Sequence, residues 1–454
     1  MAAILDKQTL ISMRTLVVGV GRTGESVMRY LQRIDSVFEV ADEKLNTVRQ
    51  EELAENFPGV RFHDVFSESL FEKYDLLIVS PGVPLTLDSI KAAQNNGVRI
   101  ASDVELFAAQ CDAPLIAVTG SNGKSTVVEW LGCVLNHHGH KTIVAGNIGT
   151  PVLDVLENEV DIVVLELSSF QLELLEELKT ISAVVLNVSE DHMDRYDSFS
   201  DYAVAKRRIH RGCHHIVVNK ADTETWPDEG VSVVSACFAL DKNRTSELNA
   251  LNCTLGHHDQ TDWLCIGGEK VMPVSEIQLA GAHNIENALA VLALLLPLQL
   301  PVSVLREGLA TFGGLPHRTQ VVNRLNGVTW VNDSKGTNVD ACVRAVAGMS
   351  APVVLIAGGL GKDADFSPLR KPVAEHVKAL ILIGRDARTI ESVLEDLVSV
   401  SHAESMRDAV EQAAHLAQSG DVVLLSPACA SFDMFDSFEH RGDVFSQEVG
   451  RLAA

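Results

Sequence analysis

Short apolar runs alternate with helical patterns along the whole chain. Each run of four or five apolar residues predicts a buried strand, and a polar or glycine-containing turn and then an amphipathic helix follow most of these runs. Three such units follow one another, and a linker rich in glycine and proline at 312–316 precedes the third. The alternation is typical of α/β proteins with mostly parallel sheets, whose ligands bind beyond the carboxyl ends of the strands. The polar residues at those ends are therefore the candidate functional residues.

The clearest motif lies in the second unit, where residues 118–126 read Val-Thr-Gly-Ser-Asn-Gly-Lys-Ser-Thr between an apolar run and a helical pattern. Glycines let backbone amides approach phosphates, and the start of the helix adds its positive dipole end. Lys124 is expected to neutralise the terminal phosphates and Ser125 to hold Mg²⁺. The general pattern has glycine where this chain has Val118, so the loop is a shortened variant. The motif predicts binding of ATP or GTP together with Mg²⁺.

Two further strands of the second unit end near candidate metal ligands. Glu166 follows four apolar residues, and His192 comes shortly after the next strand. A carboxylate at a buried strand end is costly without a cation, and Mg²⁺ prefers such oxygen ligands. Because the ends of parallel strands meet at one edge of a sheet, we expect Glu166 and His192 to lie on the same side as the phosphate loop.

Residues 219–222 read Asn-Lys-Ala-Asp, the form in which many GTPases recognise guanine. A GTPase also needs the full-length phosphate loop and an Asp-x-x-Gly switch after an intervening strand. That strand instead ends in Glu-Leu-Ser-Ser at 166–169, without glycine. We therefore interpret residues 219–222 as a turn that ends a strand.

The first unit contains the turn Gly-Val-Gly-Arg-Thr-Gly at 19–24, between a strand and a helix, and Asp42 follows a second strand. This fits a dinucleotide-binding fingerprint in outline. Another strand ends in Ser-Pro-Gly at 80–82, whose small residues leave room for a base or sugar. Nucleotide binding, as in a nicotinamide-dependent oxidoreductase, and a plain sheet turn both remain open from these residues.

Charged and hydroxyl side chains follow the strands of the third unit. Arg318, directly after the linker, is a candidate arginine finger for the γ-phosphate. Asp333 and Lys335 follow one strand, Lys362 another, and the segment 426–432 a third. These side chains are predicted to meet at one sheet edge, where they supply the charges that a second, anionic substrate needs.

Composition limits the possible partners and surroundings. The net charge of −24 disfavours nucleic acid and anionic membranes, because both require basic surfaces. The eight cysteines include no Cys-x-x-Cys pair and are interpreted as reduced thiols. Neither a membrane-spanning apolar run nor a signal-peptide pattern is found. We expect a cytoplasmic monomer that acts on small molecules.

In these motifs the chain resembles the bacterial Mur ligases nearly end to end. The motifs that carry the resemblance are Gly120 to Thr126, Gly146 to Gly149, Glu166 to Leu172, Asp191-His192, Gly281 to Asn284 with Asn287, Leu315 to Arg318, and Asn332 to Asn338. The run Glu-Leu-Ser-Ser-Phe-Gln-Leu at 166–172 and the run Ser-Pro-Ala-Cys-Ala-Ser-Phe-Asp at 426–433 are similar to the D-glutamate-adding members in particular.

The resemblance implies three domains: a Rossmann-like domain for the UDP-linked substrate at 1–105, a central P-loop-type ATPase domain at 106–314, and a Rossmann-like domain for the amino acid at 315–454. It further implies an ATP- and Mg²⁺-dependent ligase of cytoplasmic peptidoglycan synthesis. In that reaction ATP phosphorylates the terminal carboxylate of UDP-N-acetylmuramoyl-L-alanine, and the amine of D-glutamate then displaces phosphate. Such chemistry needs positioning and charge neutralisation more than a covalent nucleophile.

The family's functional residues map onto this chain by motif. Around ATP they are Gly120, Ser121, Asn122, Gly123, Lys124, Ser125, Thr126, His283, Asn284, Asn287, Arg318 and Asp333. Around the UDP-linked substrate they are Arg22, Thr23, Asp42, Ser80, Pro81, Gly82, Asn147 and Gln171. Around D-glutamate they are Lys335, Thr337, Lys362, Ser431 and Phe438. The chain departs from the family pattern after Asp42, where Glu43 and Lys44 replace a small hydroxyl residue and an arginine, and at Gly336, where alanine is common.

Lys206 would be interpreted as a solvent-exposed lysine on a helix from its position alone. The resemblance instead implies that it becomes a carbamate, formed from a neutral amine and CO₂ and favoured by nearby Mg²⁺. The implied metal ligands are then Ser125, Glu166, His192 and Lys206, and the implied catalytic residues are Lys124, Glu166, His192 and Lys206.

Three other functions remain possible at this point. They are a sibling Mur ligase or folylpolyglutamate-type ligase with another amino acid, a nucleotide-dependent oxidoreductase, and a non-catalytic nucleotide-binding regulator. The last two leave the combination of Lys124, Glu166, His192 and Lys362 in one chain without a role.

Overall fold

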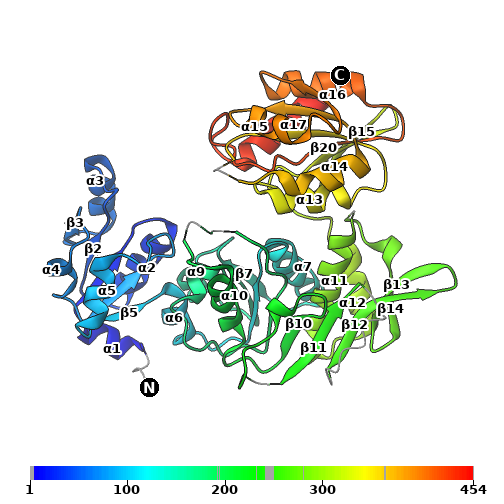
Figure 1. The fold of residues 1–454 in the computed structure, drawn as a ribbon. Helices are drawn as coiled ribbons and strands as arrows, with labels where there is room; N and C mark the ends of the chain where they lie inside the picture. The colour runs from blue at the N-terminus through cyan, green and yellow to red at the C-terminus, as the bar shows by residue number, and fades with distance from the viewer. Residues whose placement is uncertain are drawn as a thin grey trace. The chain divides into compact units, whose positions relative to one another are not determined.

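A computed structural model describes residues 5–191, 193, 195–231, 233–240, 250–279, 281–361 and 364–452. Within these ranges the strands form three sheets, shown in Figure 1. By its internal contacts the chain divides into two compact units. The first comprises Met1–Gly256, Leu264–Val271 and Leu289–Gly308, and the second comprises His257–Trp263, Met272–Ala288 and Leu309–Ala454.

The first sheet has the strand order β3-β2-β1-β4-β5, and every adjacent pair is parallel. Its strands are β1 (Thr15–Val18), β2 (Phe38–Ala41), β3 (Phe62–His63), β4 (Leu76–Val79) and β5 (Arg99–Ala101). The helices of this segment are α1 (Lys7–Ser12), α2 (Arg22–Arg33), α3 (Thr47–Asn56), α4 (Glu68–Phe71), α5 (Asp88–Asn95) and α6 (Asp103–Ala108). This order is that of a Rossmann fold without its sixth strand, and it brings the carboxyl ends of β2, β1 and β4 side by side.

The second sheet has the order β14-β13-β12-β11-β10-β9-β6-β8-β7, and the pairs from β7 to β12 are parallel. Its strands are β6 (Leu115–Thr119), β7 (Thr142–Gly146), β8 (Ile162–Glu166), β9 (Ser182–Val185), β10 (Ile216–Asn219), β11 (Val234–Ala239), β12 (Leu251–His258), β13 (Thr261–Ile266) and β14 (Glu269–Pro273). The helices of this segment are α7 (Lys124–His137), α8 (Val152–Val155), α9 (Ser169–Leu172), α10 (Phe199–Arg207), α11 (Ala282–Leu295) and α12 (Val302–Thr311).

The third sheet has the order β15-β16-β20-β17-β18-β19, in which β15 is antiparallel to β16 and the other pairs are parallel. Its strands are β15 (Gln320–Leu325), β16 (Val328–Asn332), β17 (Val353–Gly358), β18 (Val377–Ile383), β19 (Ser399–His402) and β20 (Val422–Leu425). The helices are α13 (Val339–Ala347), α14 (Arg370–His376), α15 (Ala387–Leu394), α16 (Met406–Leu416) and α17 (Phe438–Arg451).

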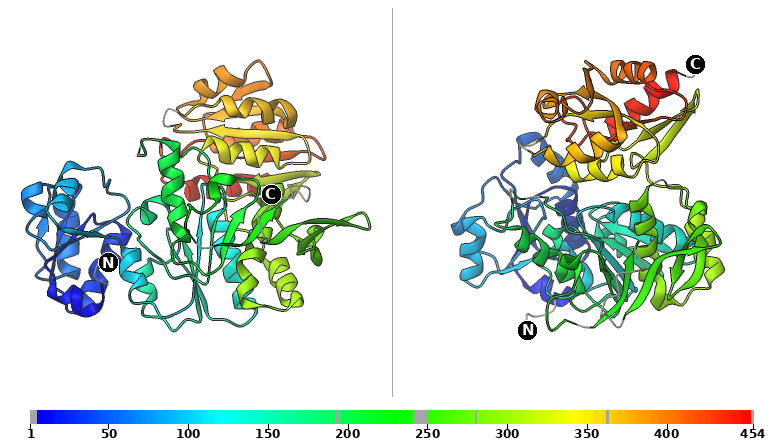
Figure 2. Two further views of the ribbon diagram at one scale, coloured as in Figure 1. Left: turned by 60° about the horizontal axis from the view of Figure 1, so that its bottom comes forward. Right: turned by 45° about the vertical axis from the view of Figure 1, so that its right-hand side comes forward.

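Helices cover both faces of the third sheet, as Figure 2 shows. Successive side chains of a strand point to opposite faces, and β17 follows this rule. Val353 and Leu355 belong to a hydrophobic cluster with residues of α13 to α15, whereas Val354 and Ile356 belong to another with residues of α16 and α17. The apolar runs of the sequence are therefore strands that are buried on both sides.

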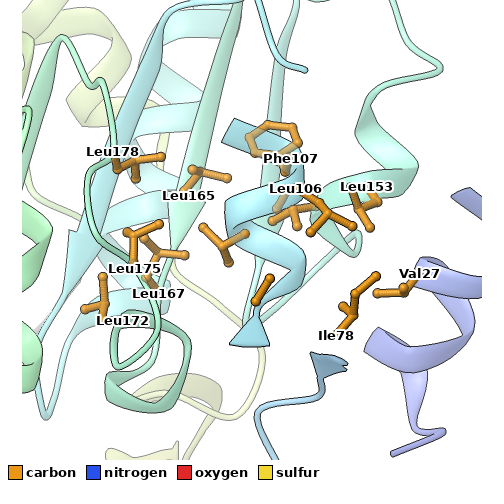
Figure 3. Packing of buried hydrophobic residues seen from close by; sticks show 14 of the residues in the cluster. Val27, Ile78, Leu106, Phe107, Leu153, Leu165, Leu167, Leu172, Leu175 and Leu178 are labelled. Carbon is orange, nitrogen blue, oxygen red and sulfur yellow. The ribbon is translucent and has the colours of Figure 1, made fainter. Parts of the chain in front are cut away.

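One large hydrophobic cluster of the first unit includes residues of both the first and the second sheet. Leu106 and Phe107 of α6 are buried in it together with Val27 of α2, Leu153 of α8 and Leu165 of β8 (Figure 3). Burying this much apolar surface stabilises the fold and fixes the strands whose ends carry the polar residues.

The predicted fold class is confirmed: the chain is α/β, with three largely parallel sheets. The sequence did not indicate the antiparallel strand β15. The domain boundaries after residues 105 and 314 stay predictions. Among the described residues no helix combines the length and the apolar character needed to cross a membrane.

Candidate active site

The phosphate loop connects β6 to α7, as predicted. Gly123 caps the helix with φ +84°, and Gly120 has φ +152°, so both glycines adopt a backbone conformation that other residues rarely reach. A Cβ atom at Gly120 would also lie 3.0 Å from the Cβ of Leu186. Lys124 is the first residue of α7, and its Nζ donates to the carbonyl oxygens of Gly120, at 2.7 Å, and of Ser121, at 2.9 Å. The lysine is thus folded over the loop that is predicted to hold phosphates.

Glu166 ends β8 beside the phosphate loop, because β8 pairs with β6 and Glu166 lies opposite Val118. Its side chain is buried. Oε1 accepts a hydrogen bond of 2.8 Å from Nδ2 of Asn147, whereas Oε2 has no hydrogen-bond partner among the described residues. A buried charged oxygen without a partner is costly, and a cation would satisfy it.

The oxygen donors near the loop fit Mg²⁺. The ion takes carboxylate and hydroxyl oxygens. Oε2 of Glu166, which has no partner in the described part of the chain, and the buried hydroxyl of Ser125 at the start of α7 are of these types. In the part of the chain that the structure describes, no three His, Cys, Asp or Glu side chains form a metal-binding group. The predicted ligand His192 lies outside the described residues.

Lys206 is not on the surface, so the interpretation from its position alone is wrong. It lies on the face of α10 that packs inward, and 2% of its surface is exposed. Its Nζ donates to the carbonyl oxygen of Gly120 at 2.9 Å and lies 4.4 Å from the ring centre of Tyr202. Burial lowers the pKa of Lys206 well below its ordinary value, and the charge of Lys124 lowers this pKa further. The site therefore favours a neutral amine.

Asn187 braces the phosphate loop and was not singled out from the sequence. It follows β9, and its Oδ1 accepts from the backbone N–H of Asn122 at 2.9 Å, while its Nδ2 donates to the carbonyl oxygen of Asn122 at 3.0 Å. The backbone of Ser121 also donates to the carbonyl of Asn187, at 2.9 Å. The available signal was its position: like Glu166, it stands at the end of a strand next to β6.

The predicted nucleotide residues of the first sheet lie together at its carboxyl edge. Asp42 follows β2, and its carboxylate accepts from the backbone N–H of Val20 at 2.7 Å, within the glycine turn 19–24. Ser80 follows β4, and its hydroxyl donates to the carbonyl of Gly19 at 2.7 Å. Arg22 and Thr23 begin α2, and Pro81 and Gly82 continue from Ser80. These contacts bring the residues predicted to bind a nucleotide to one edge of the sheet.

Two arginines connect this edge to the second sheet within the first compact unit. Arg22 donates to the carbonyl of Gly149 at 2.7 Å. Arg195, which the sequence did not indicate as a site residue, donates to the carbonyl of Pro81 at 2.7 Å and lies 3.9 Å above the ring of Phe170. Gln171, predicted to contact the sugar-peptide substrate, uses its side-chain oxygen in a capping box with Ser168 at the start of α9.

The remaining predicted ATP residues lie in the second compact unit. His283, Asn284 and Asn287 share the first turns of α11, and Nδ2 of Asn287 lies 3.3 Å from Oδ1 of Asn284. Burial lowers the pKa of His283 to about 4, with a further contribution from Arg344.

Asp333 is held at the end of β16. It accepts from the backbone of Thr319 at 3.0 Å and from the hydroxyl of Ser426 at 2.7 Å. Burial nevertheless raises the pKa of Asp333 to about 6, against the lowering effect of these hydrogen bonds and of the charge of Arg318.

The predicted D-glutamate residues occupy two neighbouring loops and the start of α17. The backbone of Ala428 donates to the carbonyl of Gly336 at 2.9 Å, which joins the loop of Lys335 and Thr337 to the loop of Ser431. Nζ of Lys335 lies 3.9 Å above the ring of Phe438. Lys362, also predicted for this site, lies outside the described residues.

Arg441 of α17 ties these two loops together, and nothing in the sequence pattern singled it out. Its guanidinium is buried and donates to the carbonyl oxygens of Ser334, at 2.8 Å, and of Cys429, at 3.1 Å. Burial lowers the pKa of Arg441 to about 10.

Three family models match the chain in order. They describe the MurD-like N-terminal domain of Mur ligases at residues 13–102, the Mur ligase middle domain at 118–295 and the Mur ligase glutamate ligase domain at 317–429. Among curated relatives, the UDP-N-acetylmuramoylalanine–D-glutamate ligase of Marinobacter nauticus is 45% identical over 97% of this chain and 98% of that protein. The ligase of the same name from Pseudomonas aeruginosa is 44% identical over 96% and 98%.

Solved structures of Mur ligases share the fold. UDP-N-acetylmuramate–alanine ligase from Thermotoga maritima matches 97% of this chain and 100% of its own with a TM-score of 0.59 at 19% identity. MurF from Acinetobacter baumannii matches 98% and 92% with a TM-score of 0.57 at 15% identity. The chain belongs to the Mur ligase family, and along nearly its whole length it is similar to the D-glutamate ligases of that family.

Proposed function

We propose that this protein is an ADP-forming ligase that joins D-glutamate to UDP-N-acetylmuramoyl-L-alanine, a cytoplasmic step of peptidoglycan synthesis. The observation that carries the proposal is the 44–45% identity, over nearly the full length, to ligases named for this reaction. The strand-end residues of the second sheet support it, because they supply a phosphate loop beside a buried carboxylate, one oxygen of which has no partner among the described residues.

The reaction takes place in two transfers. The terminal carboxylate of the alanine attacks the γ-phosphorus of ATP, which gives an acyl phosphate and releases ADP. The amine of D-glutamate then attacks the activated carbonyl carbon, and the tetrahedral intermediate expels phosphate as the amine loses a proton. The protein must hold anions close together and stabilise the charge that develops during both transfers.

Lys124 and the loop amides are proposed to bind the phosphates of ATP. Lys124 would exchange the carbonyl oxygens of Gly120 and Ser121 for phosphate oxygens, a short movement because Nζ already lies over the loop. Ser125, Glu166, His192 and Lys206 are the residues proposed to hold Mg²⁺. When bound, the ion neutralises charge on the phosphoryl group in transfer.

Lys206 is proposed to act as a carbamate. Burial and the charge of Lys124 shift the pKa of its amine well below the ordinary value, toward the neutral form, and a neutral amine adds CO₂ with loss of one proton to give an anion. The resulting carboxylate would stand at the phosphate loop, where the amine now donates to the carbonyl of Gly120. The side chain would thereby change from an amine into an anionic ligand for Mg²⁺.

The substrates are assigned to the other strand ends. The edge formed by Arg22, Thr23, Asp42 and the turn 80–82 is proposed to bind the uridine nucleotide, with Asn147 and Gln171 near its peptide end. Lys335, Thr337, Lys362, Ser431 and Phe438 are proposed to bind D-glutamate, and His283, Asn284, Asn287, Arg318 and Asp333 to contact ATP. We propose that the protein is a monomer. We further propose that its partners are these small molecules alone, since a net charge of −24 disfavours nucleic acid.

Phosphate release tests the proposal. The purified protein is supplied with ATP, Mg²⁺ and UDP-N-acetylmuramoyl-L-alanine, and the amino acid is varied. We expect release to depend on D-glutamate and to remain near background with L-lysine, meso-diaminopimelate or no amino acid. Equal release with another of these amino acids would assign the chain to a sibling ligase instead, and binding of ATP without any turnover would indicate a regulator.

A further inference from the structure

The segment Asn219–Asp222 forms the turn that ends β10, which confirms its interpretation as a strand end. The two side chains that recognise guanine in GTPases, here Asn219 and Asp222, both form hydrogen bonds within this protein. Nδ2 of Asn219 donates to the carbonyl of Leu186 at 3.0 Å, and its Oδ1 accepts from the backbone of Ala221 at 2.9 Å. Asn219 is buried, so a base has no access to these atoms.

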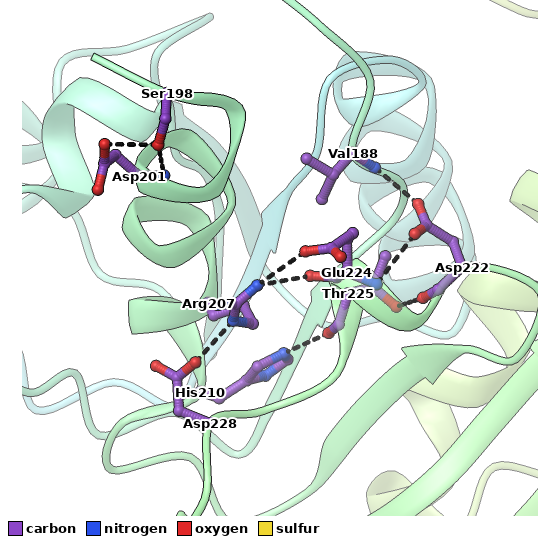
Figure 4. Close-up of polar contacts among 9 residues, drawn as sticks. All are labelled: Val188, Ser198, Asp201, Arg207, His210, Asp222, Glu224, Thr225 and Asp228. Atoms are coloured by element: carbon purple, nitrogen blue, oxygen red, sulfur yellow. Dashed lines mark hydrogen bonds and ion pairs between the residues drawn. The ribbon is translucent and has the colours of Figure 1, made fainter. Parts of the chain in front are cut away.

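Asp222 uses its two carboxylate oxygens for different purposes. Oδ1 accepts from the backbone N–H of Glu224 at 3.1 Å, a local contact that closes the turn. Oδ2 accepts from the backbone N–H of Val188 at 2.8 Å, and Val188 lies 34 residues earlier, in the loop after β9 (Figure 4). Hydrogen bonds to an ionised acceptor are among the stronger ones in proteins.

The turn itself is anchored to the protein. The hydroxyl of Thr225 donates to the carbonyl of Asp222 at 2.7 Å, and the buried ring of His210 lies 3.1 Å from the carbonyl of Thr225 through Nε2. Arg207, next to Lys206, bonds to Glu224 and Asp228, which precede and follow Thr225 in the chain (Figure 4). The turn that carries Asp222 is therefore fixed by hydrogen bonds to the rest of the second sheet's segment.

The loop after β9 connects Asp222 to the phosphate loop through hydrogen bonds. Val188 is flanked by Asn187, which pairs with the backbone of Asn122 through both side-chain atoms, and by Ser189, whose N–H donates to the hydroxyl of Ser121 at 3.0 Å. Asn187 and Ser189 thus both bond to the phosphate loop, and Val188 between them is fixed by Asp222.

We propose that Asp222 is a positioning residue for nucleotide binding. It holds Val188, and through Asn187 and Ser189 it sets the phosphate loop in the shape that receives ATP. The inference rests on the proposed function of this loop as the ATP site. Small misplacements of a binding loop are sufficient to lower catalysis by about 100-fold. Loss of the bond to Val188 is therefore expected to weaken the binding of the Mg-bound nucleotide by about 10- to 100-fold.

Asp222→Asn isolates the long-range bond. Asparagine forms the same local turn as aspartate, so its single carbonyl oxygen keeps the contact with Glu224, while the bond to Val188 is lost. Asp6→Asn is the matched control, because Asp6 likewise accepts a hydrogen bond from a nearby backbone N–H, that of Thr9, and has no hydrogen bond to the second sheet among the described residues. Both variants remove one negative charge from a chain of net charge −24.

Two measurements test the proposal. Calorimetry with Mg·ADP measures nucleotide affinity without any turnover, and steady-state kinetics gives KM for ATP and for the UDP-linked substrate. We expect Asp222→Asn to weaken Mg·ADP binding about 10-fold or more and to raise KM for ATP, with KM for the UDP-linked substrate changed by less than about twofold and with an unchanged circular dichroism spectrum.

Two results would overturn it. If Asp222→Asn binds Mg·ADP as tightly as Asp6→Asn, the bond to Val188 does not position the loop. If both KM values rise equally and the melting temperature falls, Asp222 only stabilises the fold. A wild type that binds Mg·ADP but shows no D-glutamate-dependent phosphate release would contradict the proposed function and leave this comparison of affinities intact.

Discussion

Replacing Glu166 with glutamine should have opposite effects on the free protein and on its nucleotide complex. Oε1 of Glu166 is bonded to Asn147, and the buried Oε2 has no partner in the described ranges. Glutamine keeps an oxygen for Asn147 and removes the charge. The difference between leaving a charged and a neutral polar group unsatisfied is about 1 kcal/mol, so the metal-free variant should melt roughly 2–4 °C higher than the wild type.

Mg·ATP should reverse this order. A ligand at 100 times its Kd stabilises the folded protein by about 2.7 kcal/mol, and the variant should lose most of this gain because a neutral amide is a poorer Mg²⁺ ligand than a carboxylate. Thermal melting with a chelator and with a non-hydrolysable Mg·ATP analogue gives both values, and Glu159→Gln, at an exposed glutamate, is the control. A variant that is less stable than the wild type without metal, yet gains as much from the nucleotide, would refute the reasoning.

Two further changes test the surroundings of the phosphate loop. Lys206→Ala should lose activity by about 100-fold or more and regain part of it with added short carboxylic acids, and no recovery would rule out the carbamate role. His210→Gln tests pH dependence: burial lowers the pKa of His210 from 6.5 to about 4, so the folded state binds fewer protons than the unfolded state between these values. The stabilisation is present above pH 6.5 and is lost as pH falls toward 4, by about 3 kcal/mol in total. Urea unfolding from pH 7.5 to 4.5 should show this loss for the wild type and for the exposed control His214→Gln but not for His210→Gln. An equal dependence of the unfolding free energy on pH in all three proteins would contradict the reasoning.

The residues that follow strands were largely predictable. Glu166, Asp42 and Ser80 could be placed because a run of apolar residues predicts a buried strand and parallel strands end at a common edge. The phosphate loop could be placed because its glycines and the following helix are local features, and the φ angles of Gly120 and Gly123 agree with that prediction.

Buried polar side chains on helices and turns were not predictable in the same way. Lys206 has a sequence environment typical of a helix surface, yet the packing of α10 against the phosphate loop buries it. The local turn at Asp222 could be interpreted from sequence, but its second oxygen contacts Val188 across 34 residues. Arg441 likewise depends on two loops that only the third sheet brings together.

The sequence by itself determined the α/β class, the strand ends, the phosphate loop and, through its motifs, the similarity to Mur ligases. These depend on the spacing of apolar residues and on turn chemistry, which act over a few neighbouring residues. Only the tertiary structure decided which polar atoms have hydrogen-bond partners: the paired Asn187, the bridging Asp222, the buried amine of Lys206 and Oε2 of Glu166, which has no partner among the described residues. The reason is physical, because burial and hydrogen bonding in a folded chain depend on residues that are distant in sequence.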